Sequence, residues 1–192
     1  MPRVKQFDDQ EVLNQAMNLF WKQGYAATSV QDLVSHLGIS RASLYDTFGN
    51  KEQLFNKAFK AYRKNNLEQL CQFFQNQPDV KEGIKRFFEM GIDESICTDR
   101  KGCFVVNTTT ELIPGDENIL KVLEENKRSL ENLFYEYLKK GEQEGQFKAK
   151  ESLRTIASLM FMLYSGLKVV SKIKPDKMEL MSSVNAILFL LD

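Results

Sequence analysis

The residues best able to catalyse a reaction or bind a metal are few in this 192-residue sequence. It has three cysteines, Cys71, Cys97 and Cys103, and a single histidine, His36, with no CxxC pair. A structural zinc site needs four such ligands at close spacing, so we expect neither a metal site nor a cofactor. No carboxylate pair or glycine-rich phosphate loop stands out, which argues against an enzyme. The odd number of cysteines also argues against a disulfide framework.

Cys103 is the cysteine whose neighbours favour reactivity. It follows Lys101 and Gly102 at the expected start of a helix, where the helix dipole and a nearby cation would stabilise a thiolate. One hypothesis is therefore that Cys103 senses oxidants or electrophiles. A rival hypothesis makes it the nucleophile of a helical enzyme, but His36, the only histidine, lies far along the chain. The third alternative is a buried, unreactive thiol, which is common for a free cysteine.

The overall composition is that of an ordinary globular protein. Apolar residues make up 43% and charged residues 27%, and the formal net charge is zero. This balance excludes a uniformly basic scaffold that binds nucleic acid by charge alone. The longest uninterrupted apolar runs, 159–164 and 186–191, are far shorter than the roughly 18 residues of a membrane span. We therefore expect no membrane association, and the absence of a signal peptide pattern predicts a cytoplasmic protein.

Helical spacing of the apolar residues along the whole chain predicts an all-α fold of about nine helices. The segment 103–112 is rich in β-branched residues, but an isolated strand would have no partner, so we expect a helix there too. The expected helices span 8–23, 29–37, 41–48, 51–75, 79–97, 103–112, 116–141, 150–172 and 176–191.

Two short helices in the first third of the chain predict a helix-turn-helix. The segments 29–37 and 41–48 are joined by only the three residues 38–40. Thr28 and Ser29 each precede a polar residue at the spacing of a capping box, which marks the start of the first of these helices. The helix-turn-helix is therefore expected over about residues 29–48.

Helix N-termini carry partial positive charge and free N–H groups, so Thr28 and Ser40 are expected to contact phosphates. The outer side of the second short helix is expected to meet bases or backbone, although Tyr45 could instead cover the core with its ring. The side chains predicted to face DNA are those of Thr28, Ser40, Arg41, Ser43, Tyr45, Thr47 and Lys51.

Four strings in this region carry a family resemblance. They are Phe20 with Gly24-Tyr25, the segment 28–33 (TSVQDL), the segment 37–45 (LGISRASLY) and the segment 48–54 (FGNKEQL). With them, the first 65 residues resemble the DNA-binding domain of the TetR family of transcriptional regulators.

The resemblance assigns roles to individual residues. It implies that Thr28, Tyr45 and Lys51 touch phosphates and that Arg41 and Ser43 lie at the groove. The sequence departs from the family pattern at Thr47, where the family often has histidine or an aromatic residue. The string 102–108 (GCFVVNT) is also similar to the sixth helix of a branch that includes repressors of the electrophile-sensing type.

The resemblance further implies a two-part chain: a DNA-binding domain over residues 1–50 and a ligand-binding, dimerising domain over 51–192. The helix 51–75 would connect them. The expected protein is a repressor that a small-molecule effector releases from a palindromic operator in double-stranded DNA. An effector-binding protein that has lost DNA binding is an alternative, which the intact groove residues disfavour.

Aromatic and polar residues of the second part are candidates for an effector pocket, because such pockets are mostly apolar with a few orienting polar groups. The alternatives are that the aromatic residues fill the core and that the threonines of 108–110 bond to their own helix carbonyls. The candidates are Phe87, Phe104, Asn107, Thr108, Phe134, Tyr137, Phe161 and Tyr164.

The last two helices carry more apolar residues than a lone helix pair can bury, which predicts a homodimer through a four-helix bundle. Such a two-fold dimer would place two recognition helices about 34 Å apart, one turn of DNA. The residues expected at the interface are Leu159, Leu163, Leu167, Val170, Val184, Ile187, Leu188 and Leu191.

Overall fold

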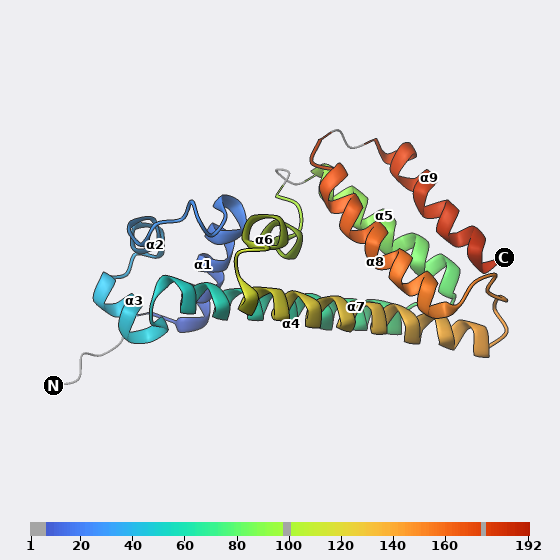
Figure 1. Ribbon diagram of the computed structural model, residues 1–192, viewed down its shortest axis with the longest axis horizontal. Helices are drawn as coiled ribbons and strands as arrows, with labels where there is room; N and C mark the ends of the chain where they lie inside the picture. Colours follow the sequence, from blue (N-terminus) through green and yellow to red (C-terminus); the bar gives the residue numbers. More distant parts are fainter. Residues whose placement is uncertain (1–6, 98–100, 174–175) are drawn as a thin grey trace. The chain divides into compact units, whose positions relative to one another are not determined.

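The structure, a computed structural model, describes residues 7–97, 101–173 and 176–192, and all its regular elements are helical (Figure 1). The predicted all-α fold is therefore confirmed, including a helix at the β-branched segment. The elements are α1 (Asp9–Gln23), α2 (Val30–Leu37), α3 (Arg41–Phe48), α4 (Lys51–Gln75), α5 (Val80–Cys97), α6 (Phe104–Leu112), α7 (Glu117–Gln143), α8 (Leu153–Val170), α9 (Lys177–Leu188) and the short 3-10 helix η1 (Phe189–Leu191).

The chain divides into two compact units, which we call the N-terminal unit (residues 1–65) and the C-terminal unit (residues 66–192). The N-terminal unit contains α1, α2, α3 and the first part of α4. The sequence-based boundary at residue 50 follows the end of the helix-turn-helix, whereas the compact unit extends further into α4.

The core of the N-terminal unit explains why it includes part of α4. Leu54, Phe55 and Phe59 of α4 are almost completely buried. The ring of Phe55 meets the ring of Phe20 from α1 edge to face, with centroids 5.3 Å apart. Burying two phenylalanine side chains contributes several kcal/mol, so the first turns of α4 are an integral part of this unit.

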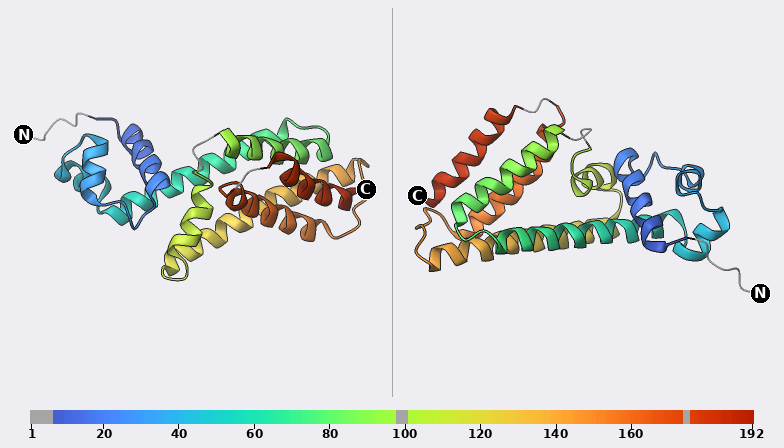
Figure 2. Two further views of the ribbon diagram at one scale, coloured as in Figure 1. Left: turned by 90° about the horizontal axis from the view of Figure 1, so that it is seen from above. Right: turned by 180° about the vertical axis from the view of Figure 1, so that it is seen from behind.

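In the C-terminal unit α5, α8 and α9 lie side by side (Figures 1 and 2), and α7 packs closely on α8. Its core is rich in aromatic rings: Phe74 contacts Phe87, Phe134 and Tyr137, with centroid distances between 4.5 and 6.0 Å. The buried core also takes in Met160 of α8 and Val184 of α9. Aromatic rings thus fill the centre of this unit.

Helix α8 is long and apolar enough, by length and composition alone, to cross a membrane. Only one such helix is found in the described part of the chain, and core helices of globular bundles pass the same test. One side of α8 is buried in the C-terminal unit through Ile156, Ala157 and Met160. We therefore describe α8 as a bundle helix.

Candidate nucleic-acid interface and ligand cavity

The start of α2 is held by a reciprocal capping box between Ser29 and Asp32. The Ser29 hydroxyl accepts from the Asp32 amide at 3.1 Å, and the Asp32 carboxylate accepts from the Ser29 amide at 2.8 Å. These hydrogen bonds lower the pKa of Asp32 below its usual value. The capping predicted for Ser29 is confirmed, so the first helix of the helix-turn-helix begins where the sequence indicates.

Thr28, by contrast, is turned into the unit. Its side chain is completely buried, and its hydroxyl donates to the carbonyl of Gly24 at 2.6 Å. The hydroxyl closes the turn between α1 and α2. The predicted phosphate contact of the Thr28 side chain is therefore wrong, because the oxygen that would meet the phosphate lies inside the protein.

Helix α3 begins at Ser40, whose hydroxyl accepts from the Ser43 amide at 3.1 Å. The inner side of α3 is fixed by Leu44 and Phe48, both buried. The other candidate DNA contacts on this helix remain accessible: Arg41 and Tyr45 are exposed, and Ser43 and Thr47 are partly exposed. With 43% of its surface accessible, Tyr45 does not cover the core, which contradicts the alternative reading of its ring.

The C-terminal end of α3 is capped by a lysine from the next helix. The Lys57 ammonium group donates to the carbonyl of Phe48 at 3.2 Å and lies 3.4 Å from that of Thr47. It also lies 5.6 Å from the centre of the Phe48 ring. A cation at this end of a helix offsets the negative pole of its dipole. Sequence reasoning missed Lys57, because the contact spans two helices and has no local pattern.

Lys51, at the start of α4, is also oriented by a contact that the sequence did not predict. Its ammonium nitrogen lies 4.3 Å from the centre of the Tyr25 ring, a cation–π arrangement. The Tyr25 ring in turn packs on Phe55, with centroids 4.8 Å apart. Tyr25 thus anchors the cationic side chain to the core of the N-terminal unit.

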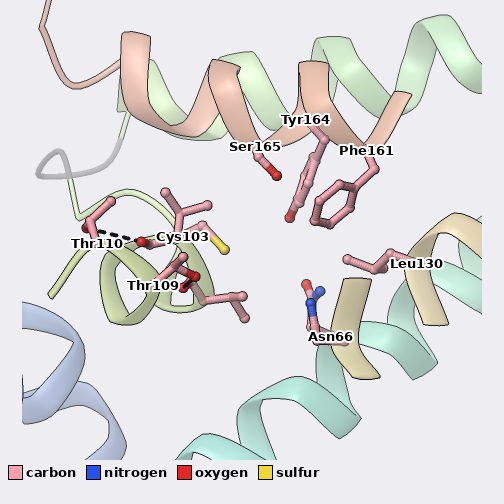
Figure 3. A pocket seen from close by; sticks show the side chains of 11 residues that line it. Asn66, Cys103, Thr109, Thr110, Leu130, Phe161, Tyr164 and Ser165 are labelled. Atoms are coloured by element: carbon pink, nitrogen blue, oxygen red, sulfur yellow. Dashed lines mark hydrogen bonds between the residues drawn. The ribbon is translucent and has the colours of Figure 1, made fainter. Parts of the chain in front are cut away.

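A cavity of about 230 Å³ lies in the C-terminal unit, between α4, α6, α7 and α8 (Figure 3). Cys103, at the N-terminus of α6, is buried and lines it, as do Phe161 and Tyr164 of α8. The full set of lining residues is Asn66, Cys103, Val105, Val106, Thr109, Thr110, Asn126, Leu130, Phe161, Tyr164 and Ser165.

Only Phe161 and Tyr164, of the eight predicted pocket residues, line this cavity. Phe87, Phe134 and Tyr137 instead pack in the aromatic core. α6 presents Val105, Val106, Thr109 and Thr110 to the cavity, so the predicted residues of α6 lie on its other faces. Phe104 and Thr108 are buried, and Asn107 bonds to the carbonyl of Lys101 and to Lys172. The prediction included α6, α7 and α8 correctly, but it added Phe87 of α5, missed Asn66 of α4 and chose the wrong faces of α6 and α7.

The threonine hydroxyls are largely used within α6 itself. Thr109 donates to the carbonyl of Val105 at 2.8 Å, and Thr110 bonds to the carbonyls of Val106 and Asn107. The alternative in which threonines bond to their own helix is therefore confirmed for these two residues. Although both line the cavity, their hydroxyl protons are already engaged.

Tyr164 places a phenol beside Cys103 in the cavity wall. Burial raises the pKa of Tyr164 strongly, and the neighbouring Cys103 and Glu94 raise it further. The hydroxyl is therefore protonated at neutral pH. The Asn66 amide projects into the same space from α4 (Figure 3).

The predicted interface residues of α8 and α9 divide into two groups. Leu167, Val184, Ile187 and Leu191 are buried in the C-terminal unit, so an interface role for them is wrong: they hold the two helices in their own core. Leu159, Leu163 and Leu188 are partly exposed, and Val170 is exposed. Other large apolar residues exposed in this part of the chain are Met162, Val169, Ile173, Met178 and Phe189.

Within the part of the chain that the structure describes, no group of three or more histidine, cysteine or carboxylate side chains could hold a metal ion. The two candidate sites are the exposed polar side of the short helix α3 and a separate cavity lined by uncharged residues. Neither arrangement resembles a catalytic constellation of nucleophile and base.

Known proteins similar to this chain are transcriptional regulators. Residues 12–58 match the model of the family "Bacterial regulatory proteins, tetR family". Among curated proteins, the HTH-type transcriptional regulator YezE of Bacillus subtilis is 33% identical, with both chains covered completely. The HTH-type transcriptional repressor ComR of Escherichia coli is 27% identical over 88% of this chain and 82% of its own.

Solved structures of similar fold cover almost the whole chain. A cysteine variant of the TetR family transcriptional regulator CifR, complexed with 26-bp double-strand operator DNA, superposes with a TM-score of 0.85. It is 25% identical and covers 99% of this chain and 100% of its own. The reduced form of NemR from Escherichia coli has a TM-score of 0.86 at 14% identity, covering 95% and 96%, which shows a shared fold.

Replacing Lys57 by methionine removes the cation at the end of α3 while keeping the length of the side chain. We expect the free energy of unfolding of the N-terminal unit to fall by about 0.5–1 kcal/mol, since a helix C-terminus loses its positive partner. Lys60→Met removes the same charge from the same helix without touching α3 and serves as the control. Equal urea denaturation midpoints for the two variants would contradict the capping role.

Proposed function

Because the chain belongs to the tetR family of bacterial regulatory proteins and is a DNA-binding transcriptional regulator, we propose that it is a cytoplasmic repressor without enzymatic activity. In this proposal a palindromic operator is bound by a homodimer and released when a small-molecule effector occupies the cavity of the C-terminal unit. The observation that carries the proposal is the capped helix α3 with its accessible polar side, next to Lys51.

The proposed contacts with DNA use that accessible side. Arg41 and Ser43 at the start of α3 would read base edges in the major groove, which accommodates one α-helix. Tyr45, Thr47 and Lys51 would contact phosphates, together with the N-terminus of α3 at Ser40. The zero net charge of the chain implies that a few oriented contacts supply the affinity.

A second copy of the chain would cover the exposed apolar surface of α8 and α9. Val169 and Val170 of α8 and Ile173 just after it are between 43% and 75% exposed, and Met178 of α9 and Phe189 of η1 are exposed as well. Exposed apolar side chains gathered on two packed helices are typical of a protein interface. A self-complementary contact between two such pairs gives a closed two-fold dimer, which matches the symmetry of a palindrome.

Helix α4 is the proposed route from the effector to DNA. It contributes Asn66 to the cavity and carries Lys51 and Lys57, which act in the N-terminal unit. An effector that binds the cavity better in one position of α4 would shift the population toward that position and lower DNA affinity. Because such coupling is reciprocal, operator DNA would weaken effector binding by the same factor.

The first test compares base-reading and phosphate-binding variants. Arg41→Ala and Ser43→Ala should alter the preference among sequences, with a loss of about 1–3 kcal/mol for Arg41 on the specific site. Lys51→Ala should weaken binding to all duplexes and reduce the salt slope by about one. Electrophoretic titration against matched and scrambled duplexes measures both effects, and a uniform loss for all three variants would contradict the assignment.

The dimer is tested by placing a charge on the proposed interface. Val170→Glu should shift the protein from dimer to monomer at micromolar concentration, because an unpaired carboxylate would be buried between the copies. Met90→Glu, at an exposed methionine of α5, is the matched control and should leave the dimer intact. Sedimentation velocity distinguishes the two states. A Val170→Glu protein that stays dimeric would place the interface elsewhere.

The Cys103 thiol supplies a second effector chemistry within the same cavity. We propose that a small electrophile entering it alkylates this sulfur; with iodoacetamide, the sulfur displaces iodide and the thiol proton passes to solvent. Treatment should then release DNA from the unmodified protein and from Cys71→Ser but not from Cys103→Ser. A Cys103→Ser protein that still releases DNA on treatment would leave Cys103 as a buried, unreactive thiol.

A further inference from the structure

The cavity in the C-terminal unit has an uncharged wall. None of the 11 residues that line it is an acid or a base that is charged at neutral pH. The most acidic hydroxyl among them, the phenol of Tyr164, is kept protonated by burial, which raises its pKa. A ligand that carries a charge would lose its hydration here without meeting an opposite charge, which is strongly unfavourable.

Two lysines follow the lining residues along the chain, Lys168 at the end of α8 and Lys172 just after it, but both are engaged elsewhere. The Lys168 ammonium group is 3.0 Å from the Glu94 carboxylate and also donates to the carbonyl of Gly91 at 3.3 Å. Lys172 donates to the side chain of Asn107. An anionic ligand in the cavity would therefore have to compete with existing partners for either cation.

Polar groups that could orient a neutral ligand do reach the cavity. The Asn66 amide and the Ser165 hydroxyl have no hydrogen-bond partner within the described part of the chain, and both point into the space between the helices (Figure 3). An amide side chain offers a donor and an acceptor together, so it suits a carbonyl, an amide or a hydroxyl group on a ligand.

Most of the remaining wall is apolar and includes two rings, although Thr109, Thr110 and Asn126 also line it. Phe161 and Tyr164 project side by side from α8, with Leu130 opposite them on α7 (Figure 3). The volume of about 230 Å³ limits the ligand. Since a cavity of about 150 Å³ holds one benzene molecule, this one fits a single ring with a short substituent, roughly ten non-hydrogen atoms.

We infer that the effector is a compact, uncharged molecule: one ring that packs on Phe161 and Tyr164, with a carbonyl, amide or hydroxyl group that bonds to Asn66. This inference rests on the proposed effector role of the cavity and names the class of molecule that fills it. It excludes carboxylates, ammonium compounds and large polycyclic ligands as effectors.

The test uses benzamide and benzoate, which have the same shape and number of non-hydrogen atoms but differ in charge at pH 7. Calorimetric titration of the full-length protein should show that benzamide binds at least about tenfold more tightly than benzoate. Benzoate must lose the hydration of its charge, and a tenfold difference in affinity needs only 1.4 kcal/mol of that cost. Asn66→Leu should weaken benzamide binding, whereas Asn65→Leu, at an exposed neighbour that does not line the cavity, should leave it unchanged.

Ser165→Leu fills part of the cavity and should also weaken benzamide binding, which would show that benzamide binds in the cavity. The inference is overturned if benzoate binds as tightly as benzamide, if neither binds at millimolar concentration, or if Asn66→Leu and Ser165→Leu both bind benzamide normally. Specific binding to duplex DNA is measured on the same protein without ligand. Intact DNA binding with a failed ligand test rejects the effector class alone, whereas absent DNA binding rejects the proposed function.

Discussion

The burial of Phe55 and Phe59 is the interaction on which the rest of the structure depends. These two rings join the first turns of α4 to the core formed by Phe20 of α1, so α4 is part of the DNA-binding unit before it becomes part of the other one. The same helix then supplies Asn66 to the cavity. In the proposed mechanism, a ligand that displaces α4 at the cavity would act on the residues that support α3.

Two lysines of α4 make the contacts through which the cavity would be linked to the N-terminal unit. Lys57 neutralises the end of α3, and Lys51 is held over the Tyr25 ring close to the expected phosphate contacts. Both lysines lie on the part of α4 that belongs to the N-terminal unit, so a displacement of α4 would act on α3 through them. In this account the cavity needs no direct contact with DNA, because it alters the position of groups that already hold the reading helix in place.

The fold was predictable from local signals, while the cavity was not. The capping pair at Ser29 and the short connection 38–40 mark helix ends within a few residues, so helix bounds and the helix-turn-helix follow from the chain itself. Which side of α6 faces the cavity depends on its packing against other helices, and the sequence assigned Asn107 and Thr108 to the wrong side. The predictions for Thr28 and Leu167, both buried, failed for the same reason. Residue spacing identifies an apolar or polar side of a helix, but tertiary packing decides which residues of that side are buried.

Sequencing of the duplexes that the purified protein retains from a random library, at moderate salt, tests the central claim most directly. A dimeric regulator that presents two copies of α3 predicts an enriched palindrome, with half-sites about one turn of DNA apart, about 34 Å. An unenriched pool, or a single half-site with no symmetric partner, would contradict the account of a dimer that reads an operator through α3.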